Sequence, residues 1–297
     1  MNPIRIVITD FHSALGTALA YEFEREAVTL LGADLPDWRD SDAVMAYIRH
    51  HQPAIIINIY GCSDLYRPGQ VEALREVAEN LAQACAVYQI PLLHLSSYLV
   101  FGNENKNIHN EKDETQPLTP LGQAFLAAEQ LLDEHLQKWI GLRVSWLIGC
   151  EGNNLLTHLL TAIFEDRRVC GVNASLRGAP TPLVDIARVC AGIVKQVLCG
   201  SENWGIMHYC SAEACTEADF ARQVLQTLEQ LQLYDENIQL EIVDDAPADE
   251  PTSAVLGCRR VRDGFGVQAR AWRPVLLPMI RQWVEDNHQP VDQDKCS

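Results

Sequence analysis

Residues 4–16 read IRIVITDFHSALG, and this stretch decides the fold. Ile4 to Ile8 form a short run of mostly β-branched residues, which is typical of a buried strand. From Leu15 to Phe23, apolar residues recur at the three- and four-residue spacing of a helix. A strand, a tight turn and a helix in this order are the opening unit of a parallel sheet that carries helices on its faces.

The same alternation of strand and helix continues through the first half of the chain. Residues 54–59 and 91–95 are almost wholly apolar, as expected of strands covered on both faces. Helical spacing follows at 71–85 and 123–136, and a further strand is expected at 142–147. The sequence therefore predicts an α/β fold, a Rossmann-like doubly wound parallel sheet.

The pattern changes after about residue 150. Helices are predicted at 155–164, 183–198, 217–231 and 275–284, with short strands near 206–209 and 238–243. We therefore expect a Rossmann-like NAD(P)-binding type of domain over residues 1–150. A smaller substrate-binding type of lobe is expected over 151–288, with room to interleave with the sheet, and residues 289–297 are expected to be a disordered tail.

The composition excludes several functions. The chain has 297 residues and a formal charge of −17, so its surface repels nucleic acid and anionic membranes. No apolar run approaches the ~20 residues that a membrane span needs. The ten cysteines form no C-x-x-C pair and no metal-ligand pattern, which favours reduced thiols in a cytoplasmic protein and predicts no metal site.

Six short motifs occur in order along nearly the whole chain. They are residues 8–16, 95–102, 117–122, 142–146, 152–154 and 177–182. Together they resemble the extended short-chain dehydrogenase/reductase family, and within it the dTDP-4-dehydrorhamnose reductases and the regulatory beta subunit of methionine adenosyltransferase. The resemblance implies a nicotinamide dinucleotide at the first turn of the sheet and a sugar nucleotide in a neighbouring cleft.

The first turn departs from the family pattern T-G-x-x-G-x-x-G, whose positions here are Thr9, Asp10, Ser13 and Gly16. Glycine at the second and third of these positions lets the backbone approach a pyrophosphate at the helix N-terminus. Asp10 places a carboxylate there instead. Two like charges at ~4 Å repel by roughly 4 kcal/mol at an effective dielectric of ~20, and solvent reduces this value.

The resemblance assigns two more residues to the cofactor site. Leu15 belongs to the same turn, and Asp34, after the second strand region near 29–34, is a candidate for the acid that reads the ribose. Arg39 is the first basic residue beyond it. With both phosphate-approach glycines replaced, we expect no NAD(P) binding or only weak binding.

The catalytic signature of the family is a serine or threonine followed by Tyr-x-x-x-Lys on a helix. The four-residue spacing places phenol and ammonium on one helix face, and the cation lowers the pKa of the phenol so that it can transfer a proton. Ser97 matches the hydroxyl position, but Leu121 stands at the tyrosine position and Phe125 at the lysine position. Neither replacement can transfer a proton or carry a charge.

The resemblance also places a set of residues around the substrate cleft: Tyr98, Trp146, Asn153, Asn154 and Pro180. Several have simpler explanations. Tyr98 can bond within its own loop, Trp146 can pack in the core, and an asparagine can cap the helix that follows. The sequence leaves these alternatives open.

The leading hypothesis is a pseudoenzyme, a reductase-like protein that acts by binding as a regulatory subunit, sensor or assembly partner. Its partner would be another protein or a second copy of the chain, and a nucleotide or nucleotide-sugar site can persist in it. The alternative is an active NAD(P)H-dependent sugar-nucleotide reductase or epimerase with rearranged catalytic groups. Cofactor binding together with turnover of a 4-keto sugar nucleotide would favour the alternative.

Overall fold

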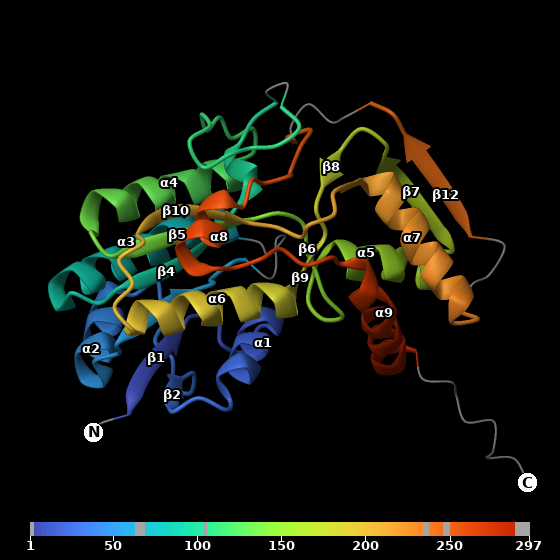
Figure 1. The fold of residues 1–297 in the computed structure, drawn as a ribbon. Helices are drawn as coiled ribbons and strands as arrows, with labels where there is room; N and C mark the ends of the chain where they lie inside the picture. Colours follow the sequence, from blue (N-terminus) through green and yellow to red (C-terminus); the bar gives the residue numbers. More distant parts are fainter. Residues whose placement is uncertain (1–2, 63–68, 104–105, 234–237, 246–249, 289–297) are drawn as a thin grey trace, which may run out of the picture.

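The computed structural model describes residues 3–62, 69–103, 106–233, 238–245 and 250–288. These residues form a sheet with helices on both faces and a smaller lobe beside it (Figure 1). The predicted tail, 289–297, lies outside the described residues.

The central sheet has six parallel strands in the order β10-β5-β4-β3-β1-β2. They are β1 (Ile4–Ile8), β2 (Val28–Leu31), β3 (Ile55–Asn58), β4 (Leu92–Ser97), β5 (Trp139–Val144) and β10 (Gly205–Tyr209). Every residue of β3, β4 and β5 is buried, which explains why these strands are so apolar in sequence. The predicted α/β, Rossmann-like parallel sheet is confirmed.

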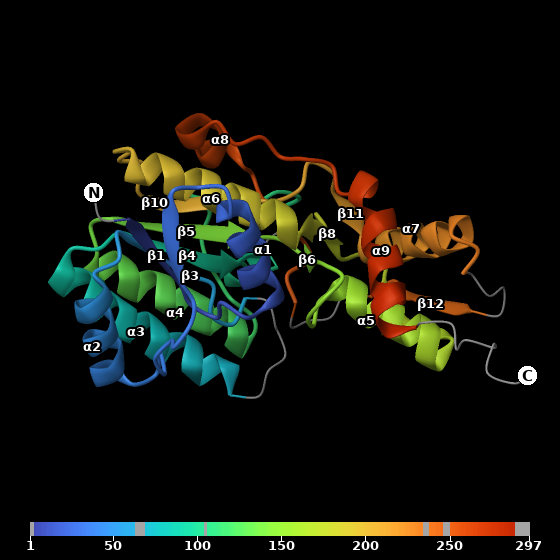
Figure 2. The ribbon, with the colours of Figure 1, turned by 90° about the horizontal axis from the view of Figure 1, so that it is seen from below.

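Two layers of helices enclose the sheet (Figure 2). One layer consists of α2 (Ser41–His51), α3 (Gln70–Tyr88) and α4 (Pro120–His135), and the other of α1 (Ala14–Phe23) and α6 (Leu183–Leu198). Strand residues alternate between the two faces. Along β1, Ile6 and Ile8 pack into the core beneath α1 and α6, whereas Val7 packs into the core beneath α2 and α3.

The smaller lobe has a core of its own. Its elements are β6 (Leu147–Ile148), α5 (Leu155–Thr161), the π-turn η2 (Ala162–Asp166), β7 (Arg168–Asn173), β8 (Arg177–Gly178), β9 (Thr181–Pro182), β11 (Cys215–Thr216), α7 (Glu217–Gln230), β12 (Gln239–Val243) and α9 (Arg273–Asn287). Its short strands pair two by two. Leu156, Phe220, Trp272 and Ile280 meet in its centre, each fully buried or nearly so.

The chain passes between the two parts of the molecule more than once. After β9 it returns to the sheet as α6 and β10, leaves again for β11 to β12, and comes back as α8 (Arg259–Phe265), which packs against β10. The smaller lobe is therefore held at the carboxyl edge of the sheet by several crossings, and ligands of such folds bind at this edge.

Several element boundaries differ from those predicted. The strand expected at 142–147 is β5, which begins at Trp139 and ends at Val144, and the helix expected at 123–136 is α4, which begins earlier, at Pro120. The helix expected at 155–164 ends at Thr161 and continues as the wider turn η2. The helix expected at 275–284 begins earlier, at Arg273, because Pro274 in its first turn suits a helix start, and it runs on to Asn287. The last turn of this helix consists mainly of polar residues, which do not follow the helical spacing of apolar residues. Among the described helices, none is both long and apolar enough to cross a bilayer.

Candidate functional site

The turn after β1 keeps a glycine-like backbone shape without glycine. The hydroxyl of Thr9 donates to Asn58 Oδ1 at 2.9 Å and accepts from the Ile59 amide at 2.9 Å, which ties the end of β1 to the end of β3. Asp10 then adopts a φ of +35°, in the left-handed region that glycine ordinarily occupies. A carboxylate therefore stands at this turn where the family pattern has a hydrogen atom.

Ser13 and Gly16 close the turn against α1. Ser13 is the N-cap of α1, and its Oγ accepts from the Gly16 amide at 3.1 Å. A Cβ on Gly16 would lie 2.2 Å from the carbonyl oxygen of Phe11, so close packing requires glycine there. The Gly16 amide, which a bound anion could otherwise use at the start of α1, thus donates its hydrogen bond to Ser13 instead.

The phenyl ring of Phe11 covers the end of β2. A Cβ built on Gly32, the residue after β2, would lie 2.2–2.4 Å from three carbons of the Phe11 ring, so the ring rests directly on the glycine backbone. In dinucleotide-binding folds an acid about 20 residues beyond the glycine turn reads the ribose in this region. Here Phe11 takes up the space over Gly32, and Asp34 lies farther on, exposed, with a φ of +54°.

Helix α4 presents two apolar side chains at the positions of the catalytic signature. Leu121 packs against the core of the sheet, and Phe125 is 1% exposed. Gly122 lets α4 approach the 3₁₀ turn η1 (Tyr98–Val100), since a Cβ there would lie 2.2 Å from the Leu99 carbonyl oxygen. Ser97 and Phe125 line the same cavity, so the structure brings the two positions together without a phenol or an ammonium at 121 and 125.

A buried ion pair holds α4 to the sheet one turn beyond Phe125. Arg143 on β5 donates to Glu129 twice, from Nε to Oε1 at 2.9 Å and from Nη2 to Oε2 at 2.6 Å, and the two side chains are 5% and 4% exposed. Ser96 Oγ donates to the same Oε1 at 2.6 Å, and the guanidinium lies over the Phe101 ring. The pair satisfies both charges internally, so neither is offered to a ligand.

Two histidines are buried in the sheet. His94 on β4 accepts a hydrogen bond at Nδ1 from Asn58 Nδ2 at 2.8 Å, and burial lowers its pKa to about 4. His208 on β10 lies near Arg143, and burial together with that positive charge lowers its pKa to about 3. Both imidazoles are therefore neutral core groups near pH 7.

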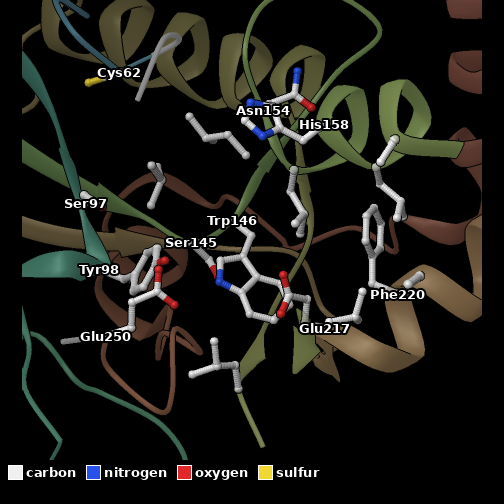
Figure 3. Close-up of a pocket in the computed structure, with 18 of the residues that line it drawn as sticks. Cys62, Ser97, Tyr98, Ser145, Trp146, Asn154, His158, Glu217, Phe220 and Glu250 are labelled. Carbon is white, nitrogen blue, oxygen red and sulfur yellow. The ribbon is translucent and has the colours of Figure 1, made fainter. Parts of the chain in front are cut away.

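A cavity of about 290 Å³ lies between the carboxyl ends of β4 and β5 and the smaller lobe (Figure 3). Apolar and aromatic side chains make up most of its wall, and Trp146 and Phe220 are among the largest of them. A few polar groups reach it, among them Tyr98 and Asn154. An apolar pocket with a small number of polar groups is typical of a small-molecule site.

The charged residues of the cavity wall are acidic. Glu217, the first residue of α7, accepts a hydrogen bond at Oε2 from the Asn173 amide at 2.8 Å, and burial raises the pKa of its carboxyl. Glu250 lies on the other side of the cavity, near Tyr98 (Figure 3). Among the described lining residues none is lysine or arginine. The Glu217 carboxylate in this wall is unfavourable for a diphosphate.

The predicted cleft residues fall in different places. Tyr98, Trp146 and Asn154 line the cavity. Asn153 lies instead in a neighbouring surface groove, and Pro180 is buried outside the cavity wall. Asn154 also caps α5, because its side chain accepts from backbone amides in the first turn of that helix. The predicted cofactor positions, Asp34 and residues 9–16, with Leu15 buried on α1, are not part of the wall.

Four residues that shape the site were not predicted from the sequence: Phe11, Glu217, Phe220 and Glu250. Phe11 offered a signal, because it directly follows the first altered glycine position of the turn. The other three lie on α7 and on the segment after β12, far along the chain. They reach β4 and β5 only because the chain crosses back over the edge of the sheet. No local sequence pattern predicts that crossing.

The fold and the cavity define an α/β protein of the dinucleotide-binding type with a second lobe at the carboxyl edge of its sheet. Within the part of the chain that the structure describes, no group of three or more possible metal ligands is present. The model of the RmlD substrate binding domain family matches residues 4–284, and the chain belongs to that family.

Individual relatives agree with this assignment. A dTDP-4-dehydrorhamnose reductase of Aggregatibacter actinomycetemcomitans is 26% identical over 95% of this chain and 99% of its own. Methionine adenosyltransferase 2 subunit beta of Danio rerio is 29% identical over 72% of this chain and 70% of its own. The resemblance to both groups is confirmed.

Solved structures share the fold. The dTDP-4-dehydrorhamnose reductase of Clostridium acetobutylicum superposes with a TM-score of 0.79 at 22% identity, over 94% of this chain and 99% of that one. The enzyme of the same name from Bacillus anthracis, in complex with NADP, has a TM-score of 0.76 at 22% identity, over 95% and 99% of the two chains.

Proposed function

We propose that this protein is a non-catalytic member of its family, which acts by binding as a regulatory, sensing or assembly protein. One observation carries the proposal: Leu121 and Phe125 occupy the two positions from which the family signature supplies a phenol and an ammonium. Ser97 is the member of the signature that remains, and its hydroxyl accepts from the Leu99 amide at 3.3 Å.

The chemistry of carbonyl reduction explains why these positions matter. Hydride addition to a ketone leaves an alkoxide that must receive a proton, and a positioned acid contributes roughly 10²–10⁴-fold to the rate. Tyr98 is a phenol in the cavity wall, and no lysine or arginine is among the described residues of that wall. In the family signature the lysine lowers the pKa of the phenol from ~10 toward neutral pH, and this chain has no lysine at that position.

The first turn supports the same proposal. The residues at the turn do not fit a nicotinamide dinucleotide: Asp10 adds a carboxylate, Ser13 caps the helix, and Phe11 lies over Gly32. The Bacillus anthracis relative is described in complex with NADP, so the fold can hold this cofactor. We propose that the present chain binds NAD(P) weakly or not at all, and we derive no reaction step through it.

A binding role requires a partner. The Danio rerio relative is named as the beta subunit of a methionine adenosyltransferase, which supports a role as a subunit of an assembly. We propose that the partner is a protein, either a different chain or a second copy of this one, inside a cytoplasmic compartment.

An active reductase is the second candidate, and two observations favour it. Several relatives are named as dTDP-4-dehydrorhamnose reductases, and Ser97 is retained at the carboxyl end of β4, beside the cavity. In that case Tyr98 would have to replace the missing acid. The residual nucleotide or nucleotide-sugar site expected from the sequence belongs to the non-catalytic candidate, whereas an active reductase or epimerase would need a complete one.

A fluorescence titration with NADPH tests the proposal. The wild-type chain is expected to give no saturable enhancement in the micromolar range. The variant Asp10→Gly/Phe11→Ala/Ser13→Gly is expected to gain binding, because it removes the charge, the ring and the cap. Leu121→Tyr/Phe125→Lys is the matched control: it restores the signature on α4 but leaves the turn unchanged, so it should gain no binding. Saturable wild-type binding together with reduction of a 4-keto sugar nucleotide would refute the proposal.

A further inference from the structure

We propose that the cavity between the sheet and the smaller lobe binds a small organic cation, a ligand with one aromatic or apolar ring and a protonated amine. The inference rests on the proposed function, because it assigns the cavity to binding and not to hydride transfer. The ligand class differs in charge from a sugar nucleotide, whose diphosphate is anionic.

The position of Glu217 is the first argument. Its side chain is partly buried in an apolar wall, and its Oε2 has one backbone donor, the Asn173 amide at 2.8 Å. No ion pair joins Glu217 to a lysine or arginine in the described ranges. Burial raises the pKa of this carboxyl, and the Asn173 amide offsets only part of that effect. An ammonium placed in the cavity would supply the missing compensation.

Trp146 is the second argument. Its indole points into the same space as the Glu217 carboxylate (Figure 3). The ring is held in place because it lies directly on Gly178, where a Cβ would come within 2.2 Å of the ring carbons. A fixed indole attracts a cation through its face, and this attraction is strongest where water is excluded.

The size and the described charges of the cavity favour a small cation over a sugar nucleotide. A volume of about 290 Å³ is near the lower limit of ligand pockets, ~300–1,000 Å³, and suits a single ring with a short side chain. The Glu217 carboxylate would face a diphosphate, and no lysine or arginine is among the described residues of the wall. The larger groove that contains Glu151, Glu165 and Trp283 is more open to solvent, so it is a weaker candidate.

The test compares ligands of similar shape and different charge. The probes are 2-phenylethylamine, 2-phenylethanol and 3-phenylpropionate, which are cationic, neutral and anionic, together with thymidine diphosphate. Calorimetric titration of the full chain at pH 8, without nicotinamide cofactor, should show the amine binding at least about tenfold more tightly than the alcohol. The carboxylate and the diphosphate should give no measurable binding.

Variants assign the preference to the cavity. Glu217→Gln keeps the shape of the side chain and should reduce the preference for amine over alcohol to about twofold or less. Glu229→Gln is the matched control: it removes the same charge from an exposed position on the same helix, outside the cavity wall, and should keep the preference. Trp146→Phe should weaken binding of the amine more than binding of the alcohol. It serves as the second variant if Glu217→Gln does not fold.

The outcomes are separable from those of the proposed function. Equal affinity for amine and alcohol, tighter binding of thymidine diphosphate, or a preference that survives Glu217→Gln would each overturn the inference. None of these results requires hydride transfer. Turnover with NADPH would instead overturn the proposed function, whatever the relative affinities of the cationic, neutral and anionic probes.

Discussion

Replacing Glu129 by alanine should strongly destabilise the protein. The substitution leaves the Arg143 guanidinium buried at 5% exposure without its two carboxylate bonds of 2.9 and 2.6 Å. It also removes the acceptor of the Ser96 hydroxyl. Breaking one partner of a buried ion pair costs about 3–5 kcal/mol, against a total free energy of unfolding of ~5–15 kcal/mol. We expect a loss within that 3–5 kcal/mol range.

Urea unfolding at pH 7, followed by circular dichroism, measures this loss. The control is Glu76→Ala, which breaks the exposed pair with Arg39, whose side chains are 46% and 51% exposed. An exposed pair contributes ~0–1 kcal/mol, so the control should change little. The double variant Glu129→Leu/Arg143→Met removes both charges and should recover most of the stability, because no unpaired charge remains. A loss below about 1 kcal/mol for Glu129→Ala would refute this account of how α4 is held on the sheet.

Three further predictions concern stability. The pKa of His94 is about 4 in the folded state, below the ordinary ~6.5. As the pH drops from about 6.5 toward 4, the unfolded chain therefore takes up the His94 proton before the folded chain does, and the free energy of unfolding falls. In unfolding titrations, His94→Gln should reduce this fall by about 1.4 kcal/mol per pH unit. Asn154→Ala should cost about 1–2 kcal/mol in urea unfolding through loss of the α5 cap, and an unchanged midpoint would contradict that role. Gly122→Ala should lower the thermal midpoint, because its Cβ would lie 2.2 Å from the Leu99 carbonyl oxygen and such overpacking costs ~1–3 kcal/mol; Gly192→Ala, with open space around its Cβ, is the control.

The sheet could be predicted because its signals are local. Residues 4–8 and 91–95 are apolar runs bounded by turns, and strands covered on both faces leave this pattern in any sequence. The family motifs then gave the order of the elements. The boundaries of α5 and α9 were less accurate, because the helix end at Thr161 and the extension to Asn287 depend on neighbouring packing and on polar residues without periodicity.

The site could be predicted only in part. Positions on elements next to the motifs, such as Ser97 and Phe125, were found because their spacing along the chain fixes their place. Glu217 was not found, because it reaches the cavity only through the packing of the second lobe. Phe11 shows a different limit: a sequence shows that a glycine is missing, but the position of the neighbouring ring over Gly32 is a three-dimensional fact.

The most direct measurement of the central claim is hydride transfer itself. The full chain is incubated at high concentration with an excess of NADPH and dTDP-4-dehydrorhamnose, and NADPH oxidation is compared with that of a protein-free sample. The account predicts equal rates in the two samples, because no residue at 121 or 125 can supply a proton or a positive charge. Turnover above the protein-free rate that Ser97→Ala abolishes would contradict it.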